Sequence, residues 1–383
     1  MAVVAKSTIK VGVLFDMVFP INEPWNMRAD VLDAFRLVLD EAHEQGRVDR
    51  PIEIVLREAE GLPLGTAKAA VDAYKELIDE GCLVVFGPAI SDNGVPLAKY
   101  ANTDGQVCCI SWTGNDAYLG EYTFCLGNGS APDEPAVLAN IIAHAGIRRV
   151  AIIGEQGLIG QQYQPYFQQA AALEGITIAG GHATIAAAVY DIKKQGADLA
   201  RQMAGWKESD IEAVIYFGFG YGPIIINEAL RLLDWSPARY TVSSWECGFL
   251  LREVEEAYLG WVGLEQYDEE NVVGQDFLDR FEKKYGRRPE YFAPGYAHDV
   301  ASIIVKAIET ATPLSADGVK EALENVRMLP AASGMPGTRL SFGRFSRRGW
   351  VGAGFMVARE FDPKNRDKTI FRGRIGQPKK WDD

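Results

Sequence analysis

The sequence predicts an α/β fold in which parallel sheets are flanked by helices and arranged in two lobes. Short, continuously apolar segments such as CLVVF and VCCIS alternate with longer segments whose apolar residues recur at helical spacing. Strands with this continuous apolar character occur in parallel sheets that helices cover on both faces. The length of 383 residues also fits two domains, because a domain usually holds about 100 to 200 residues.

The first series of elements begins with a strand at Ile9–Phe15, a short run rich in β-branched residues that ends in turn-forming residues. A helix follows at 29–44, where Val31, Phe35 and Val38 lie on one face and Gly46 ends the pattern. The series continues with strands at 52–56, 83–86 and 107–111 and a helix at 67–80.

A second series starts after the turn-rich segment NGSAPDEP at 128–135. We expect strands at 150–153, 176–179 and 213–217, and helices at 136–145, 161–174 and 222–233. The chain then re-enters sheet at 261–264, forms helices at 272–285, 294–311 and 316–325, and ends in hairpin-like segments at 338–342 and 352–358. Tandem domains explain this order poorly, so the sequence predicts two lobes joined by more than one crossing.

Composition excludes several classes of function. The formal net charge is −13, so the surface field repels nucleic acids and anionic membranes. No apolar run reaches the roughly 18 residues that a membrane-spanning helix needs, so no membrane insertion is expected. Five cysteines, an odd number lying mostly in apolar runs, are expected to be reduced core thiols. The first ten residues contain no apolar leader, which indicates a cytoplasmic protein unless a signal peptide has been removed, in which case it is periplasmic or extracellular.

Several segments, taken in their order and spacing, resemble the type I periplasmic binding proteins. The resemblance is to the leucine/isoleucine/valine-binding branch, which also includes amide sensors and receptor ectodomains. It spans nearly the whole chain and rests on IKVGVLFD, IDEGCLVVFGPAISDNGVPLAKYANTDGQVCCISWTGND, RRVAIIGEQGLIGQQY, AVIYFGFGYGP, SSWECG and PGYAHDVASII.

This resemblance implies two flavodoxin-like lobes that close by a hinge around one small ligand. Lobe I comprises 1–128 plus 253–331 and lobe II comprises 129–252 plus 332–383, with three crossings near Asn128, Arg252 and Pro330. The family implies delivery of the ligand to an ABC permease, no cofactor, no metal, no catalysis, and a monomer or a homodimer.

The resemblance also implies the ligand-binding residues. In open α/β sheets, ligands bind at the carboxyl ends of strands, where helix N-termini offer free amides to anions. A serine at the place of Ser91 holds the ligand carboxylate in the family, although serine is also a common helix cap. Glu246 falls where amino-acid binders pair the ligand ammonium, although a surface position is the usual one for a glutamate. The full predicted set is Trp25, Ser91, Ser111, Trp112, Thr113, Gly114, Tyr221 and Glu246.

Two positions depart from the family pattern. Trp112 stands where relatives usually have a small residue, and Ile159 stands where many have an aromatic one. An indole either fills part of the pocket or offers a stacking face, and packing in the core is its alternative role. We therefore expect an amino acid or a related carboxylate or amide, aromatic ligands included, rather than leucine itself.

Two other functions remain open from the sequence. A cytoplasmic amide-type sensor that regulates a partner protein is the first alternative. The second is an α/β enzyme, suggested by the segment GFGYG at 218–222 or by Cys247 as a nucleophile. The glycine spacing does not match a dinucleotide loop, and Cys247 has no nearby histidine. The four histidines show no metal-ligand spacing. Arg344, Arg347 and Arg348 are expected to form a solvated basic patch.

Overall fold

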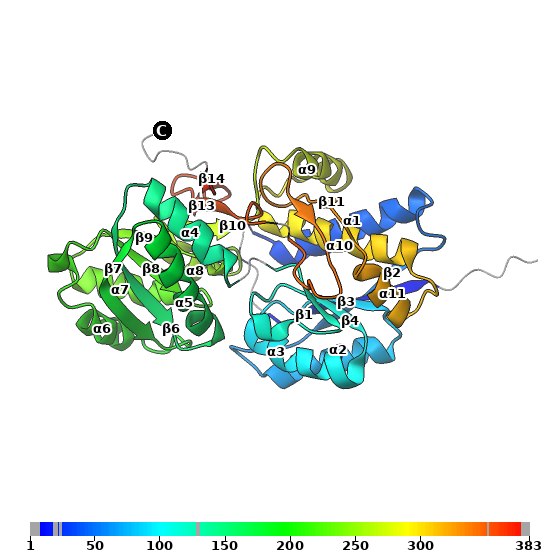
Figure 1. Ribbon diagram of the computed structural model, residues 1–383, viewed down its shortest axis with the longest axis horizontal. Helices are drawn as coiled ribbons and strands as arrows, with labels where there is room; N and C mark the ends of the chain where they lie inside the picture. Colours follow the sequence, from blue (N-terminus) through cyan, green and yellow to red (C-terminus); the bar gives the residue numbers. More distant parts are fainter. Residues whose placement is uncertain (1–7, 18–21, 23–24, 128–130, 351, 377–383) are drawn as a thin grey trace, which may run out of the picture. The chain divides into compact units, whose positions relative to one another are not determined.

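The protein is represented by a computed structural model that describes residues 8–17, 22, 25–127, 131–350 and 352–376. By its internal contacts the chain divides into two compact units, and each unit contains a parallel sheet with helices on both faces (Figure 1). Unit 1 comprises Met1–Val18, Arg28–Asn128 and Glu269–Val351, and unit 2 comprises Phe19–Met27, Gly129–Asp268 and Gly352–Asp383. The prediction of an α/β fold with two parallel sheets is confirmed.

The sheet of unit 1 has five parallel strands in the order β2-β1-β3-β4-β5. Its central strands are buried along nearly their whole length, as their apolar sequences require. The strands are β1 (Ile9–Phe15), β2 (Ile52–Glu58), β3 (Val84–Phe86), β4 (Cys108–Ser111) and β5 (Thr123–Cys125).

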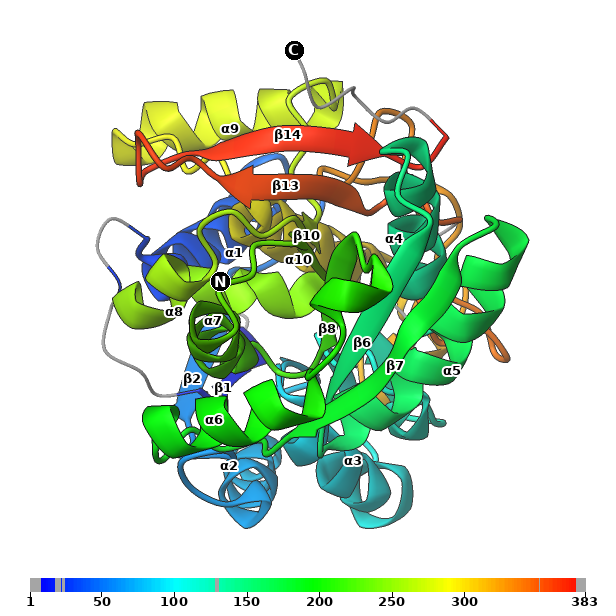
Figure 2. The same ribbon diagram turned by 90° about the vertical axis from the view of Figure 1, so that its left-hand side faces the viewer.

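Helices α2 and α3 cover one face of this sheet, and α1 and α10 cover the other (Figures 1 and 2). The apolar face predicted for 29–44 is buried in α1, at Val31, Phe35 and Val38. The helices of the unit are α1 (Met27–Glu44), α2 (Ala67–Asp79), α3 (Ser91–Tyr100), η1 (Ala101–Gly105), η2 (Asp116–Tyr118), α9 (Val272–Tyr285), α10 (Phe292–Thr310) and α11 (Ala316–Leu323).

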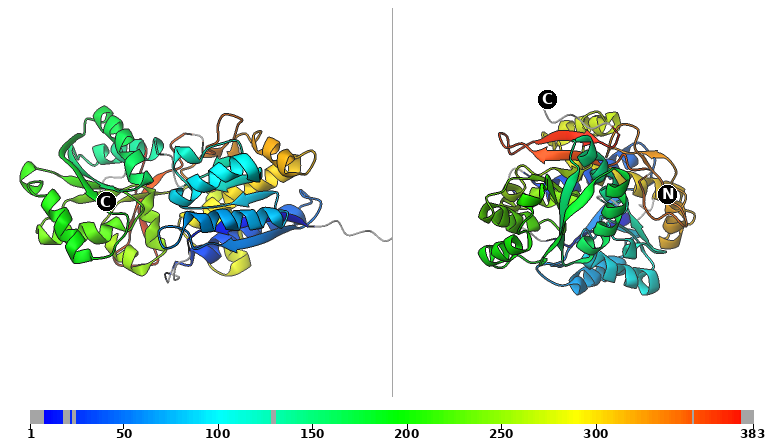
Figure 3. Two further views of the ribbon diagram at one scale, coloured as in Figure 1. Left: turned by 90° about the horizontal axis from the view of Figure 1, so that it is seen from below. Right: turned by 60° about the vertical axis from the view of Figure 1, so that its left-hand side comes forward.

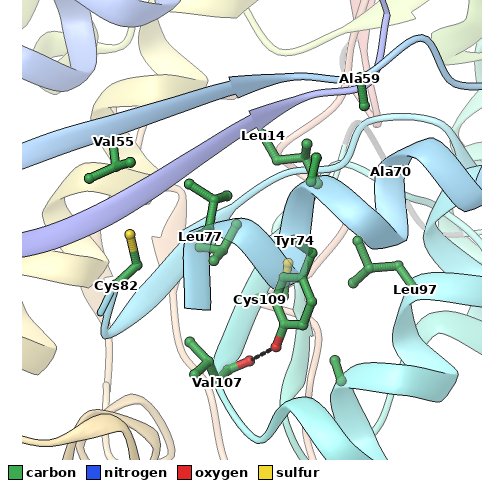
Figure 4. Packing of buried hydrophobic residues seen from close by; sticks show 13 residues of the cluster. Leu14, Val55, Ala59, Ala70, Tyr74, Leu77, Cys82, Leu97, Val107 and Cys109 are labelled. Atoms are coloured by element: carbon green, nitrogen blue, oxygen red, sulfur yellow. Dashed lines mark hydrogen bonds between the residues drawn. The ribbon is translucent and has the colours of Figure 1, made fainter. Parts of the chain in front are cut away.

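A buried cluster joins α2 and α3 to the strands of unit 1 (Figure 4). Tyr74 of α2 lies at its centre and donates a hydrogen bond to the carbonyl of Val107 at the start of β4. Leu14 and Val85 of the sheet and Leu97 of α3 complete the contact. This packing fixes α3, and therefore its first residue, relative to the ends of β3 and β4.

The sheet of unit 2 has four parallel strands in the order β7-β6-β8-β9. Helices α4 and α5 lie on one face, and α6 and α7 lie on the other (Figure 2). The strands are β6 (Arg149–Glu155), β7 (Thr177–Ile185), β8 (Ala213–Phe217) and β9 (Ala238–Thr241), and the helices are α4 (Asp133–His144), α5 (Leu158–Leu173), α6 (Ile192–Gln202), η3 (Lys207–Ser209), α7 (Gly222–Leu232), η4 (Ser243–Phe249) and α8 (Arg252–Ala257).

Short antiparallel pairings complete both units. In unit 2, β10 (Gly263–Glu265) pairs with β13 (Val357–Phe361), which forms a hairpin with β14 (Thr369–Arg374), shown in red in Figure 3. In unit 1, β11 (Leu329–Pro330) pairs with β12 (Arg339–Leu340). The first predicted hairpin-like segment, 338–342, therefore contains β12. The second, predicted at 352–358, corresponds to β13, which begins later, at Val357.

Two expectations about side chains have clear outcomes. All five cysteines are buried and reduced, as predicted. The prediction of a solvated basic patch is wrong for two of its three arginines, because Arg347 pairs with Glu324 at 2.6 Å and Arg348 pairs with Asp116 at 2.5 Å. Within the described parts of the chain, no helix is long and apolar enough to cross a membrane.

Candidate functional site

In unit 1, the residues after strands β3 and β4 bring two hydroxyl groups together. Ser91 is the first residue of α3, and Thr113 follows the end of β4. The Thr113 hydroxyl donates to the Ser91 oxygen at 2.6 Å, and both side chains are buried. Ser91 makes no capping hydrogen bond, because the N-cap of α3 is Ile90. We call Ser91 and Thr113 the hydroxyl pair.

The hydroxyl pair has one hydrogen without an acceptor. Two hydroxyls carry two hydrogens, and their mutual bond uses one of them. The backbone N–H of Asn115 donates to Thr113 at 3.4 Å and adds no acceptor. Among the described residues, nothing accepts the second hydrogen, so the pair can donate to an acceptor on a ligand, and a carboxylate oxygen is the strongest such acceptor.

An acid that the sequence analysis missed occupies the amides just before α3. Asp16, directly after β1, accepts from the N–H groups of Ala89 at 2.7 Å and Ile90 at 3.1 Å, and from the Asn93 amide at 2.8 Å. Burial raises the pKa of Asp16, and these hydrogen bonds act in the opposite direction. An internal carboxylate thus occupies the two amides that directly precede Ser91, and the Ser91 hydroxyl remains outside this set of hydrogen bonds.

Two other predicted residues of this segment are engaged within unit 1. The Ser111 hydroxyl donates to the Pro88 carbonyl at 2.7 Å and accepts from the Thr113 N–H at 2.9 Å. The Gly114 carbonyl accepts from Arg348 at 2.6 Å. These contacts hold the loop after β4 in place, so Ser111 and Gly114 support the hydroxyl pair.

Trp112 packs into an aromatic cluster of unit 1. Its ring centroid lies 4.7 Å from that of Tyr296, 5.9 Å from that of Phe86 and 6.1 Å from that of Phe292. Its indole N–H is buried and has no hydrogen-bond partner among the residues that the structure describes. The indole therefore has a packing role, and its N–H is a further donor that a polar ligand atom could satisfy.

In unit 2, Glu155 at the end of β6 shapes the loop after β8. Its carboxylate accepts from the Tyr216 hydroxyl at 2.8 Å and from the Phe219 N–H at 3.0 Å. The same tyrosine oxygen accepts from the N–H of Gly222 at 3.3 Å. Tyr221 lies in this loop with its ring centroid 5.7 Å from that of Phe219. The glycine-rich segment is therefore braced by an acid and a tyrosine, and it presents two neighbouring aromatic rings.

Glu246 lies in η4, after β9, and is only 4% exposed. Neither of its carboxylate oxygens makes a hydrogen bond of ordinary geometry with the described residues. Burial raises the pKa of Glu246 well above its usual range, the carboxylates of Glu265 and Glu134 raise it further, and the Gln266 side chain acts in the opposite direction. A buried carboxyl group without a paired cation among the described residues is compensated when a cationic group comes beside it.

The two acids near Glu246, Glu134 and Glu265, are compensated by hydrogen-bond donors and by an arginine, respectively. Glu134 accepts from the Tyr163 hydroxyl at 2.6 Å and from the Ser243 N–H at 2.7 Å. Glu265 pairs with Arg359 at 3.1 Å in the interior of unit 2. We call Glu134, Glu246 and Glu265 the acid cluster. The sequence analysis predicted Glu246 as a site residue but not Glu134 or Glu265.

Trp25 contacts the aromatic side chains beside η4. Its ring centroid lies 4.6 Å from that of Phe249 in an edge-on arrangement and 6.4 Å from that of Phe361. Trp245, next to Glu246, packs on Phe361 at 4.3 Å. In unit 2 the structure thus brings Trp25 to the segment that carries Glu246, while Tyr221 lies beside Phe219 in the loop after β8.

The surroundings of Cys247 do not support the nucleophile that the sequence left open. Burial raises the pKa of the Cys247 thiol, which donates to the Phe219 carbonyl at 2.8 Å, so the reactive thiolate form is suppressed. No group of three or more histidine, cysteine or acidic residues suited to a metal ion occurs in the described residues.

Comparisons with known proteins agree with the fold described above. A family model described as periplasmic binding protein matches residues 8–354. A periplasmic binding protein type 1 from Bordetella pertussis Tohama I has a TM-score of 0.75 at 18% identity, with 96% of this chain and 100% of that chain covered. No curated protein sequence matches the chain.

Two further solved structures carry ligands. An ABC transporter substrate-binding protein from Desulfitobacterium hafniense in complex with Leu has a TM-score of 0.75 at 17% identity, with 95% of this chain and 100% of that chain covered. An ABC transporter solute binding protein from R. palustris in complex with benzoate has a TM-score of 0.69 at 17% identity, with 98% of each chain covered. The fold is that of the type I periplasmic binding proteins, and the similar proteins are binding proteins and not enzymes.

Proposed function

Because the chain belongs to the periplasmic binding protein family, we propose that it captures a small organic ligand for uptake by an ABC permease. In this proposal both units bind the same ligand, and closure about a hinge completes its polar contacts and removes water from them. Binding is the whole activity, with no cofactor. The family also supports a periplasmic location for this step.

The observation that carries the proposal is the complementary chemistry of the two groups of residues. The hydroxyl pair in unit 1 has a hydrogen left to donate to a carboxylate or amide oxygen. Glu246 in unit 2 is a buried carboxyl group with no cation beside it among the described residues. A ligand with both a carboxylate and an ammonium group satisfies both. We therefore propose an amino acid or a close relative as the ligand.

Aromatic ligands are included in the proposed class. The rings of Phe219 and Tyr221 lie side by side in the loop after β8, and Trp25 lies near η4. Aromatic side chains offer flat apolar surfaces to a ligand ring. The R. palustris protein of similar fold was solved in complex with benzoate, which supports testing aryl carboxylates beside aliphatic amino acids.

A thermal-shift screen of the purified protein tests this proposal. The panel is aliphatic and aromatic L-amino acids, their amides, benzoate, 4-hydroxybenzoate, and nucleotides as a control class. Ligand at 100 times its dissociation constant adds about 2.7 kcal/mol of stability, which raises Tm measurably. We expect a shift within one class of amino acids or small carboxylates. Shifts with nucleotides alone would contradict the proposal.

A further inference from the structure

The three carboxyl groups of the acid cluster differ in what surrounds them. Glu134, on α4, has two hydrogen-bond donors, and Glu265, on β10, has the guanidinium of Arg359 from β13. Glu246 has neither a hydrogen-bond donor of ordinary geometry nor an ion pair among the described residues. The ion pair of Glu265 with Arg359 therefore compensates Glu265 but not Glu246.

An ionised carboxylate in a dry interior is costly unless donors or a cation compensate it, and the group takes up a proton when they are missing. Glu134 and Glu265 have such compensation, so they are the acids that stay ionised. Their negative charge then disfavours a third charge at Glu246. The neighbouring Cys247 thiol is neutral because burial raises its pKa, and the Gln266 amide carries no charge.

We propose that Glu246 holds a proton in the ligand-free protein and gives it up to solvent when the ammonium group of a ligand binds beside it. This inference rests on the proposed function, because it names the ammonium group as the partner of Glu246. The neutral acid and the ammonium ion become an ion pair plus one released proton, so atoms and charge balance. A carboxylate ligand without an ammonium group leaves the proton in place.

The consequence is a pH-dependent choice between two classes of ligand. Because binding of an amino acid releases one proton, its affinity rises about tenfold per pH unit as long as Glu246 is protonated in the empty protein. The affinity for a carboxylate that lacks the ammonium group has no such dependence at Glu246. Higher pH therefore raises the affinity for amino acids relative to that for carboxylates without an ammonium group. Lower pH reduces the difference between these two affinities.

The proton on Glu246 is tested first without any ligand. Infrared spectra of the ligand-free protein near neutral pH are compared between wild type and Glu246→Gln. We expect the C=O band of a protonated carboxyl group in wild type and its loss in the variant. Glu134→Gln is the matched control and keeps the band. If Glu246→Gln does not fold by circular dichroism, Glu246→Leu serves the same comparison. Equal spectra of wild type and a folded variant would overturn the proposal.

The release of the proton is tested with L-phenylalanine by titration calorimetry in buffers of different ionisation enthalpy. We expect about one proton released per bound amino acid, and none for 3-phenylpropionate, which has no ammonium group. Binding of an amino acid without proton release would refute the coupling and leave the proposed function standing. If the screen finds that no ammonium-bearing ligand binds while the infrared band is present, the amino-acid function fails and the protonated Glu246 remains.

Discussion

The hydroxyl pair of unit 1 and Glu246 in the acid cluster of unit 2 both follow strands of a parallel sheet, but they offer opposite chemistry. The hydroxyl pair offers a neutral hydrogen-bond donor, whereas Glu246 offers a carboxyl group. Ser91 and Thr113 follow the carboxyl ends of β3 and β4, and Glu246 of the acid cluster follows the carboxyl end of β9, an edge strand of its parallel sheet. In unit 1 the buried acid Asp16 is satisfied by three donors, and the hydroxyl pair keeps a hydrogen to donate. In unit 2 the Glu246 carboxyl group has no such donor of ordinary geometry among the described residues. The comparison teaches that the fold determines where polar groups lie at the strand ends. Whether hydrogen-bond donors or a cation compensate each acid then determines which group is left to contact a ligand.

The largest expected effect is a loss of stability in unit 1, where Trp112 directly precedes Thr113 of the hydroxyl pair. Trp112→Ala should lower the free energy of unfolding by about 3 to 5 kcal/mol, because it removes the indole from contact with Tyr296, Phe86 and Phe292. Urea denaturation measures the change, and Trp112→Phe should lose much less. A loss of ligand affinity in Trp112→Ala at unchanged stability would instead place the indole against the ligand.

The next effect concerns the charge in unit 2. Glu246→Gln should weaken binding of an amino acid by about 3 kcal/mol, on the order of 100-fold, because the ammonium group then loses its charged partner. Titration calorimetry measures the affinity. Glu208→Gln, at an exposed position of the same unit, is the control and should bind as wild type does. Equal affinity in both variants would remove Glu246 from the site.

A third effect is the dependence of stability on pH that follows from the burial of Glu246. The folded pKa of Glu246 is raised above its ordinary value of 4.5, so the native state holds one more proton than the unfolded state between the two pKa values. The stability of the ligand-free protein should therefore fall with rising pH by about 1.4 kcal/mol per unit relative to Glu246→Gln. Urea denaturation at several pH values measures this slope, and parallel curves for the two proteins would contradict it.

The smallest effect concerns the hydroxyl pair. Ser91→Ala should weaken a carboxylate ligand by about 1 kcal/mol, since one hydrogen bond of a neutral donor is lost. Ser111→Ala is the matched control, because its hydroxyl braces the loop after β4. We expect that control to lower Tm while the affinity per folded molecule stays near that of wild type. The reverse outcome, with Ser111 controlling affinity and Ser91 only stability, would exchange their roles.

Much of the fold was predictable because it depends on local patterns. Continuous apolar runs marked β1 and β8, and helical spacing marked α1 and α9. Helix α6 was missed because its sequence IKKQGADLARQ carries few apolar residues, and β9 (ARYT) was missed because it is short. Strand β9 is defined by its pairing with β8 rather than by its own residues, and α6 is positioned by its contact with α7.

The site was predictable only in part, because its chemistry depends on contacts between distant segments. Strand ends pointed to Ser91 and Thr113, and the resemblance pointed to Glu246. That Asp16 occupies the amides of Ala89 and Ile90 and that Glu134 and Glu265 surround Glu246 are consequences of tertiary packing. Hydrogen-bond compensation of a given acid has no sequence signature, so it had to come from the structure.

The most direct test of the account compares one amino acid with its deaminated carboxylate, using the amino acid that gives the largest thermal shift. Titration calorimetry gives both affinities in wild type and in Glu246→Gln. The account predicts that wild type prefers the amino acid and that the variant loses this preference while it still binds the carboxylate through the hydroxyl pair. An equal preference for the amino acid in both proteins would contradict the assignment of Glu246 as the partner of the ammonium group.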